Sequence, residues 1–151
     1  MVVRRKAAFI LFFLYASSVL SEYSRGSFGF HSYKPTTSIG FYTNRLCQTE
    51  IDHVVSLEDA WISGAKDWSL DKRKIFANDK LNHVPACDYV NRSKRSSSPK
   101  DFIRKSEDGL GVEYKILNMC LYLNIYLTVK IKYALKLQSL KEELSQYGCK
   151  K

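Results

Sequence analysis

Residues 1–21 constrain the chain most, because they set the compartment in which it has to fold. Arg4, Arg5 and Lys6 precede an apolar run over residues 7–20. A short positive stretch before an apolar run of this length is typical of a cleaved secretory signal peptide, since a membrane-spanning helix needs about 20 apolar residues. We therefore predict that residues 1–21 are a signal peptide. The mature protein is then secreted, to the extracellular space or the periplasm, and has no membrane span.

Export to an oxidising compartment determines how the four cysteines are interpreted. Secreted proteins form disulfides from an even number of cysteines, so we expect at least one bridge. The candidates are Cys47, Cys87, Cys120 and Cys149. Of the three pairings that these allow, we favour Cys47 with Cys87, which flank the most informative segment. A zinc site made by Cys47, His53, His83 and Cys87 is the alternative, although its spacings are not those of a standard zinc finger.

The composition describes a basic chain with enough apolar residues to bury a core. Of its 151 residues, 45% are hydrophobic and 13% are aromatic, which argues against a wholly disordered chain. Lys and Arg number 24 against 15 Asp and Glu, which gives a formal net charge of +9. The length fits one domain, and a positive charge of this size favours a polyanionic partner, either a nucleic acid or an anionic membrane surface.

Hydrophobic periodicity predicts an extended lead-in followed by a folded domain. Residues 22–46 are rich in Ser, Gly, Tyr and Phe without helical spacing, and we predict an extended lead-in there. The domain proper then covers residues 47–151. Within it, short β-branched runs predict strands over residues 50–57 and 81–86, and Pro85 places the second at a sheet edge or bulge.

Helical patterns account for most of the rest of the chain. We predict helix over residues 58–79, broken near Ser63 and Gly64, and over residues 88–94. Residues 113–147 read as one or two packing helices, with a strand near 128–137 as the alternative. The side chains predicted to lie in the core of the middle segment are Trp61, Trp68, Ile75 and Phe76.

Three blocks carry chemically useful side chains in a fixed order. The first, E-I-D-H-V-V-S-L, contains Asp52 and His53. The second, F-A-N-D-K-L-N-H-V, contains Asn82, and the third, V-N-R-S-K, contains Asn91 nine residues later. Together they resemble the HNH, or ββα-metal, endonuclease motif, and more narrowly the HNH family related to the C-terminal domain of GmrSD-type restriction enzymes. The resemblance covers about residues 40–102.

Two positions depart from the pattern of that family. Ser56 stands where the family usually has Pro, in the turn after the strand. Arg95 stands where it usually has Gly, beside the place where a phosphate would bind.

The resemblance implies an α+β fold with a ββα-metal core surrounded by helices. It implies that Asp52 and Asn91 hold Mg2+ or Mn2+, that His53 is the general base, and that Asn82 fixes the catalytic loop. These residue types suit phosphodiester hydrolysis, because a neutral imidazole accepts a proton near pH 7 and a hard cation prefers oxygen ligands. Neighbouring strand residues point to opposite faces, so a twist must bring Asp52 and His53 together. His83 directly follows Asn82 on its predicted strand. By the same alternation we expect the His83 side chain to face away from the site and to have a structural role.

Basic side chains cluster next to the proposed site. They are Arg92, Lys94, Arg95, Lys100, Arg104 and Lys105. We predict that they contact the phosphates of DNA, with RNA as a further substrate to test, because a phosphate backbone is bound by clustered cations. No base-reading module is evident, so little sequence specificity is expected.

The predicted function is therefore that of a secreted, metal-dependent endonuclease. Two alternative functions involve no metal-dependent cleavage of nucleic acid. One is a non-catalytic, disulfide-stabilised protein that binds nucleic acid or other polyanions. The other is a structural module held together by the zinc site described above.

Overall fold

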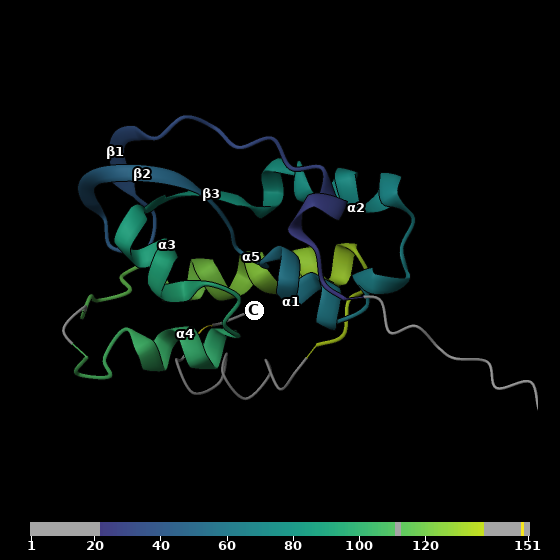
Figure 1. Cartoon of the computed structure of the whole chain (residues 1–151). Helices are drawn as coiled ribbons and strands as arrows, with labels where there is room; N and C mark the ends of the chain where they lie inside the picture. The colour runs from purple at the N-terminus through teal and green to yellow at the C-terminus, as the bar shows by residue number, and fades with distance from the viewer. Residues whose placement is uncertain (1–21, 111–112, 138–148, 150–151) are drawn as a thin grey trace, which may run out of the picture.

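A small antiparallel sheet and a set of short helices make up the fold (Figure 1), which confirms the predicted α+β class. The computed structural model describes residues 22–110, 113–137 and 149. Strands β1 (Thr36–Gly40), β2 (Arg45–His53) and β3 (His83–Cys87) lie in the order β1–β2–β3. The predicted signal peptide lies outside the described residues.

The lead-in predicted over residues 22–46 contains an unexpected strand. β1 pairs with β2 from Thr36 opposite Thr49 to Gly40 opposite Arg45. Most of β1 is exposed on both faces, so it lacks the apolar alternation that reveals a strand in a sequence. The lead-in therefore supplies one edge of the sheet instead of only preceding it.

The other edge of the sheet is β3, and its register aligns the residues of the site. β2 and β3 pair from Thr49 opposite Cys87 to His53 opposite His83. Pro85 lies within β3, which confirms the predicted edge position, because an edge strand tolerates the missing N–H of a proline. The Pro85 carbonyl accepts a hydrogen bond from the Phe41 N–H at 2.7 Å.

Short helices connect and cover the strands. They are η1 (Arg25–Phe28), α1 (Leu57–Ile62), η2 (Ala65–Asp67), α2 (Leu70–Ala77), η3 (Lys80–Asn82), α3 (Asp88–Lys94), α4 (Pro99–Lys105) and α5 (Met119–Lys132). The hydroxyls of Ser56, Ser69 and Ser98 cap α1, α2 and α4, each accepting from a backbone N–H in the first turn. The predicted break near Ser63 and Gly64 and the predicted helix over residues 88–94 are confirmed.

Helix α5 decides between the two interpretations of the C-terminal segment. The chain is helical through Lys132, so a strand starting near residue 128 is wrong, and the part of the prediction over residues 138–147 lies outside the described residues. Packing of α5 is aromatic, with the Tyr122 ring centroid 5.5 Å from those of Tyr42 and Phe102. In the described part of the chain, no helix is long and apolar enough to cross a membrane.

A second aromatic cluster attaches the lead-in to the helices. The Phe28 ring lies 6.4 Å from Trp61 and 6.2 Å from Phe76 between ring centroids, and all three side chains are buried, as predicted for the last two. Trp68 packs against this core from a partly buried position. Ile75 was predicted to join it but is 64% exposed. The buried face of α2 is made by Phe76 and Ala77, and Ile75 lies beside that face, turned to solvent.

Two disulfides join Cys47 to Cys87 and Cys120 to Cys149. The favoured Cys47–Cys87 pair is thereby confirmed. The zinc alternative is wrong, because its two thiols are consumed in this bridge. The bridge fastens β2 to the last residue of β3, directly before α3. It also explains Gly40, where an added Cβ would stand 2.4 Å from the Cys87 Sγ.

Candidate active site

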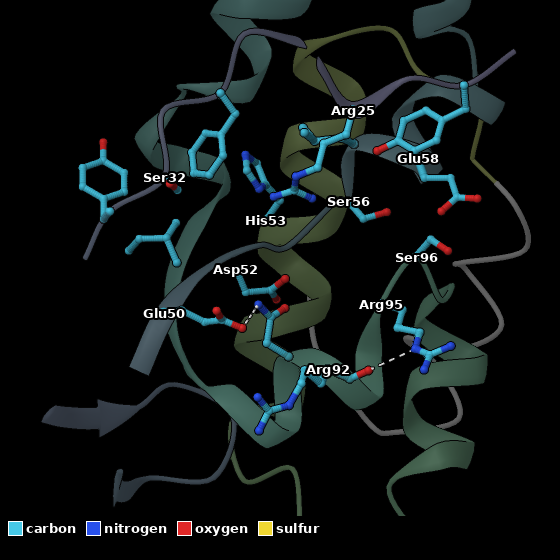
Figure 2. A pocket seen from close by; sticks show the side chains of 16 residues that line it. Arg25, Ser32, Glu50, Asp52, His53, Ser56, Glu58, Arg92, Arg95 and Ser96 are labelled. Atoms are coloured by element: carbon cyan, nitrogen blue, oxygen red, sulfur yellow. Dashed lines mark hydrogen bonds between the residues drawn. The ribbon is translucent and has the colours of Figure 1, made fainter. Parts of the chain in front are cut away.

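A pocket of about 480 Å³ lies over the C-terminal end of β2 (Figure 2). β2 contributes Glu50, Asp52 and His53 to its wall, and α3 contributes Asn91. The lead-in contributes Arg25 and other residues on the opposite side. Three of the four residues predicted for the chemistry therefore share one cavity. Asn82 does not line it.

Asp52 is buried at the base of this pocket and is held by two donors. The Tyr42 hydroxyl donates to Oδ2 at 2.5 Å, and the Lys94 ammonium donates to Oδ1 at 3.0 Å. Burial raises the pKa of the Asp52 carboxyl, and the positive charge of Lys94 acts in the opposite direction. Burial also raises the pKa of Tyr42 well above its ordinary value, so its hydroxyl stays a donor.

Lys94 occupies a different place from the one predicted for it. Its side chain is fully buried, and its ammonium also donates to the His53 carbonyl at 2.8 Å. The prediction that Lys94 contacts phosphate is therefore wrong for this structure. The physical reason is helical spacing: Lys94 follows Asn91 by three residues, so both side chains lie on the face of α3 that meets β2.

The His53 imidazole is fixed through one of its two nitrogens. Its Nε2 lies 2.8 Å from the Ala77 carbonyl oxygen, which can only accept, so Nε2 carries the proton and Nδ1 keeps the lone pair. Burial lowers the pKa of His53 to about 3, so the ring is neutral at pH 7. The Phe30 ring packs edge-on against it, with centroids 4.5 Å apart.

His83 shares this environment, and the prediction that it faces away is wrong. Residues directly opposite each other on paired strands point to the same face, and His83 is the register partner of His53. Its Nε2 lies 2.9 Å from the same Ala77 carbonyl and 3.3 Å from the His53 Nε2. Burial lowers the pKa of His83 as well. His83 is not part of the pocket wall, so it borders the site without opening into it.

Asn82 is completely buried and clamps the loop that follows His53. Its Oδ1 accepts from the Val55 N–H at 2.8 Å, and its Nδ2 donates to the Val55 carbonyl at 3.0 Å. Its own carbonyl accepts from the Val54 N–H at 2.9 Å. These contacts hold the loop in place, and the role of Asn82 in catalysis through that loop stays a prediction.

Glu50 lines the pocket beside Asn91 and was not singled out from the sequence. Its Oε1 accepts from the Asn91 Nδ2 at 2.8 Å, which turns the amide so that its carbonyl oxygen remains as an acceptor. Strand periodicity could have found Glu50, because it stands two residues before Asp52 on the same face of β2.

The oxygen atoms of Glu50, Asp52 and Asn91 form a donor set that suits a hard divalent cation. Tyr42 and Lys94 use two of the roughly four lone-pair positions of the Asp52 carboxylate, so further coordination is chemically open. Among the described residues, no group of three or more His, Cys, Asp or Glu side chains could hold a metal ion. The set therefore depends on the amide of Asn91 as its third member.

The five predicted phosphate-binding residues other than Lys94 divide into three groups. Arg92 and Arg95 line the rim of the pocket, across from Arg25 in Figure 2. Lys105 lines a neighbouring pocket, whereas Lys100 and Arg104 are exposed on α4 outside both. Arg25 was missed, because nothing in the lead-in sequence relates it to the three blocks.

Comparison with known proteins gives the class of this site. The chain belongs to the family of GmrSD restriction endonucleases, C-terminal domain, whose sequence model matches residues 5–146. This confirms the predicted relation and indicates a nuclease-related function, for which a nucleic acid is the implied substrate.

One relative is described as an uncharacterized secreted protein of Arthroderma benhamiae. It is 33% identical over 92 residues, which cover 60% of this chain and 41% of the relative. The matched segment thus spans less than half of that protein. Its description and the two disulfides here agree with secretion. No solved structure matches the chain.

Proposed function

We propose that the protein is a secreted, metal-dependent endonuclease of the HNH type that hydrolyses phosphodiester bonds in DNA with little sequence specificity. RNA is a further substrate to test. The observation that carries the proposal is the meeting of His53, Asp52 and Asn91 in one pocket. In this proposal β2, β3 and α3 form the ββα-metal unit.

The metal, Mg2+ or Mn2+, would be held by Asp52 and Asn91, with Glu50 as an additional oxygen ligand. When bound, such a cation stabilises the negative charge that develops on the phosphate. The Lys94 and Tyr42 contacts hold the Asp52 carboxylate in place, so it does not have to reorient when a cation binds.

His53 is the proposed general base. The Ala77 carbonyl holds the Nε2 proton, which leaves Nδ1 to accept a proton from the attacking water. Because the ring is neutral at pH 7, no proton has to leave it first. Phe30 and the buried end of β2 restrict the orientation of the ring, and orientation of this kind lowers the entropic part of the barrier.

Arg25 and Arg95 stand on opposite sides of the pocket and would bind the phosphates that flank the cut. A guanidinium offers paired donors that match phosphate oxygens. The proposal thus assigns recognition to the backbone of the substrate, which explains why little sequence specificity is expected.

Incubating the secreted protein with supercoiled plasmid and with RNA, in parallel with Mg2+, Mn2+ and EDTA, tests the proposal. Nicking that requires the divalent ion is the expected result. Binding of plasmid without any metal-dependent cleavage would instead identify the non-catalytic polyanion-binding alternative.

A further inference from the structure

A second pocket, of about 550 Å³, adjoins the candidate active site. Its wall includes Tyr89, Lys105, Asp108 and Leu110. Arg92 and Arg95 line both pockets, so the two cavities share a rim made of guanidinium groups. This second pocket plays no part in the chemistry described above.

At this shared rim, Arg95 has a backbone conformation that is unfavourable for a residue with a side chain. Arg95 has φ 50° and ψ −129°, a conformation that favours glycine. It is also the position at which the resemblance leads one to expect Gly. Residues kept in such conformations cluster at functional sites. The side chain is exposed, and its Nε donates to the Arg92 carbonyl at 3.3 Å.

The lining of the second pocket matches the parts of a nucleotide. Three cations, Arg92, Arg95 and Lys105, and one acid, Asp108, line the pocket, and Arg92 is also paired with Asp88. The Tyr89 ring is held edge-on against Tyr114, with centroids 6.1 Å apart, and Leu110 is 81% exposed. An aromatic ring beside cations is the usual platform for a base and its phosphate.

We propose that the second pocket binds the nucleotide next to the scissile phosphate and that Arg95 binds the phosphate between the two subsites. This deepens the proposed function and rests on it. A base can enter a pocket of this kind only when it is unpaired, so the preferred substrate is a single strand.

Fluorescence anisotropy in EDTA, where no metal-dependent cleavage occurs, tests the subsite directly. The probes are a fluorescein-labelled ten-nucleotide oligothymidylate and a labelled DNA hairpin duplex. Wild-type protein should bind the single strand more tightly. Arg95→Gly should weaken binding to both probes about tenfold, because a charge-assisted contact is lost, and should lower the log–log salt slope for the single strand by about 0.7.

Tyr89→Leu should weaken binding of the single strand at least about fivefold and leave the duplex unaffected, since it removes only base stacking. Leu110→Asp, at an exposed position, should also weaken binding of the single strand. It replaces Tyr89→Leu if that variant does not fold. Lys66→Ala, an exposed charge change outside both pockets, is the control. The melting temperature of Arg95→Gly should equal or exceed that of the wild type.

The subsite is refuted if the Arg95 and Tyr89 variants bind as Lys66→Ala does, or if the wild type prefers the duplex. If the protein gives either of these binding results but still cleaves through His53, the proposed function stands and the subsite is refuted. A protein that binds single strands as expected but never cleaves loses the proposed function: its second pocket is then a nucleotide-binding pocket, and its place beside a scissile phosphate is refuted.

Discussion

Asp52 and Lys94 form a buried ion pair, in which each charge depends on the other. The Asp52 and Lys94 side chains are 5% and 0% exposed. Asp52 also accepts from the buried Tyr42 hydroxyl, and Lys94 also donates to the carbonyl of the buried His53. Lys94→Met should lower the free energy of unfolding by about 3–5 kcal/mol, because it leaves the Asp52 carboxylate without its cation. Urea denaturation followed by circular dichroism measures this change.

Arg92→Ala provides the matched control for that prediction. It removes a 2.8 Å ion pair with Asp88 that is largely exposed, and it should change the unfolding free energy by less than about 1 kcal/mol. Equal losses in the two variants would show that Lys94 is not the buried partner that holds Asp52.

Site residues that belong to the three sequence blocks could be predicted from their spacing. Site residues that are placed by contacts between different helices and strands could not. Asp52, His53 and Asn91 were found from their order along the chain. The burial of Lys94 and the approach of His83 to His53 follow from the packing of α3 on β2 and from the β2–β3 register. The three-residue spacing puts Lys94 on the same helix face as Asn91, but the sequence alone does not show that this face is buried against β2 or which residue pairs with His53.

At the scale of elements, the Cys47–Cys87 bridge connects the strand that carries Asp52 to the start of the helix that carries Asn91. Replacing both cysteines by Ala should lower the unfolding free energy by roughly 2–4 kcal/mol, because the closed loop spans a sequence separation of 40 residues. Activity at a temperature where the variant stays folded should also fall.

The Cys120–Cys149 bridge is the comparison, since it begins at α5, away from the pocket wall. Its double Ala variant should lose stability but keep the activity of the folded protein. Equal activity losses in the two variants would mean that the Cys47–Cys87 bridge does not position the site.

Elements with strong local signals were predicted well. The predicted break near Gly64 separates α1 from α2, and the helix predicted over residues 88–94 is α3. β1 was missed because an exposed edge strand needs little alternation of apolar residues. Its extended conformation is stabilised by pairing with β2, which its own sequence does not reveal.

For the whole molecule, the buried His53 makes stability depend on pH. Its pKa in the folded state is about 3, below the ordinary value of 6.5, so between these values the unfolded chain binds a proton that the folded chain does not. The unfolding free energy should therefore fall as the pH drops below 6.5, by up to about 1.4 kcal/mol per pH unit from this group. The lowered pKa of His83 acts in the same direction.

Denaturation curves between pH 7 and pH 4.5 measure this slope, and His53→Gln should make it shallower. His31→Gln, at an exposed position, should leave it unchanged. A slope that stays the same in His53→Gln would mean that His53 is not the buried neutral group described here.

The central claim concerns His53 as the base and Asn91 as a metal ligand, and the rate of plasmid nicking as a function of Mg2+ concentration tests both. At saturating Mg2+, His53→Ala should be about 10²–10⁴-fold slower, whereas His83→Ala should lose less than about tenfold. Asn91→Ala should instead raise the Mg2+ concentration needed for half-maximal rate. Normal cleavage by His53→Ala, with His83→Ala inactive, would contradict this account.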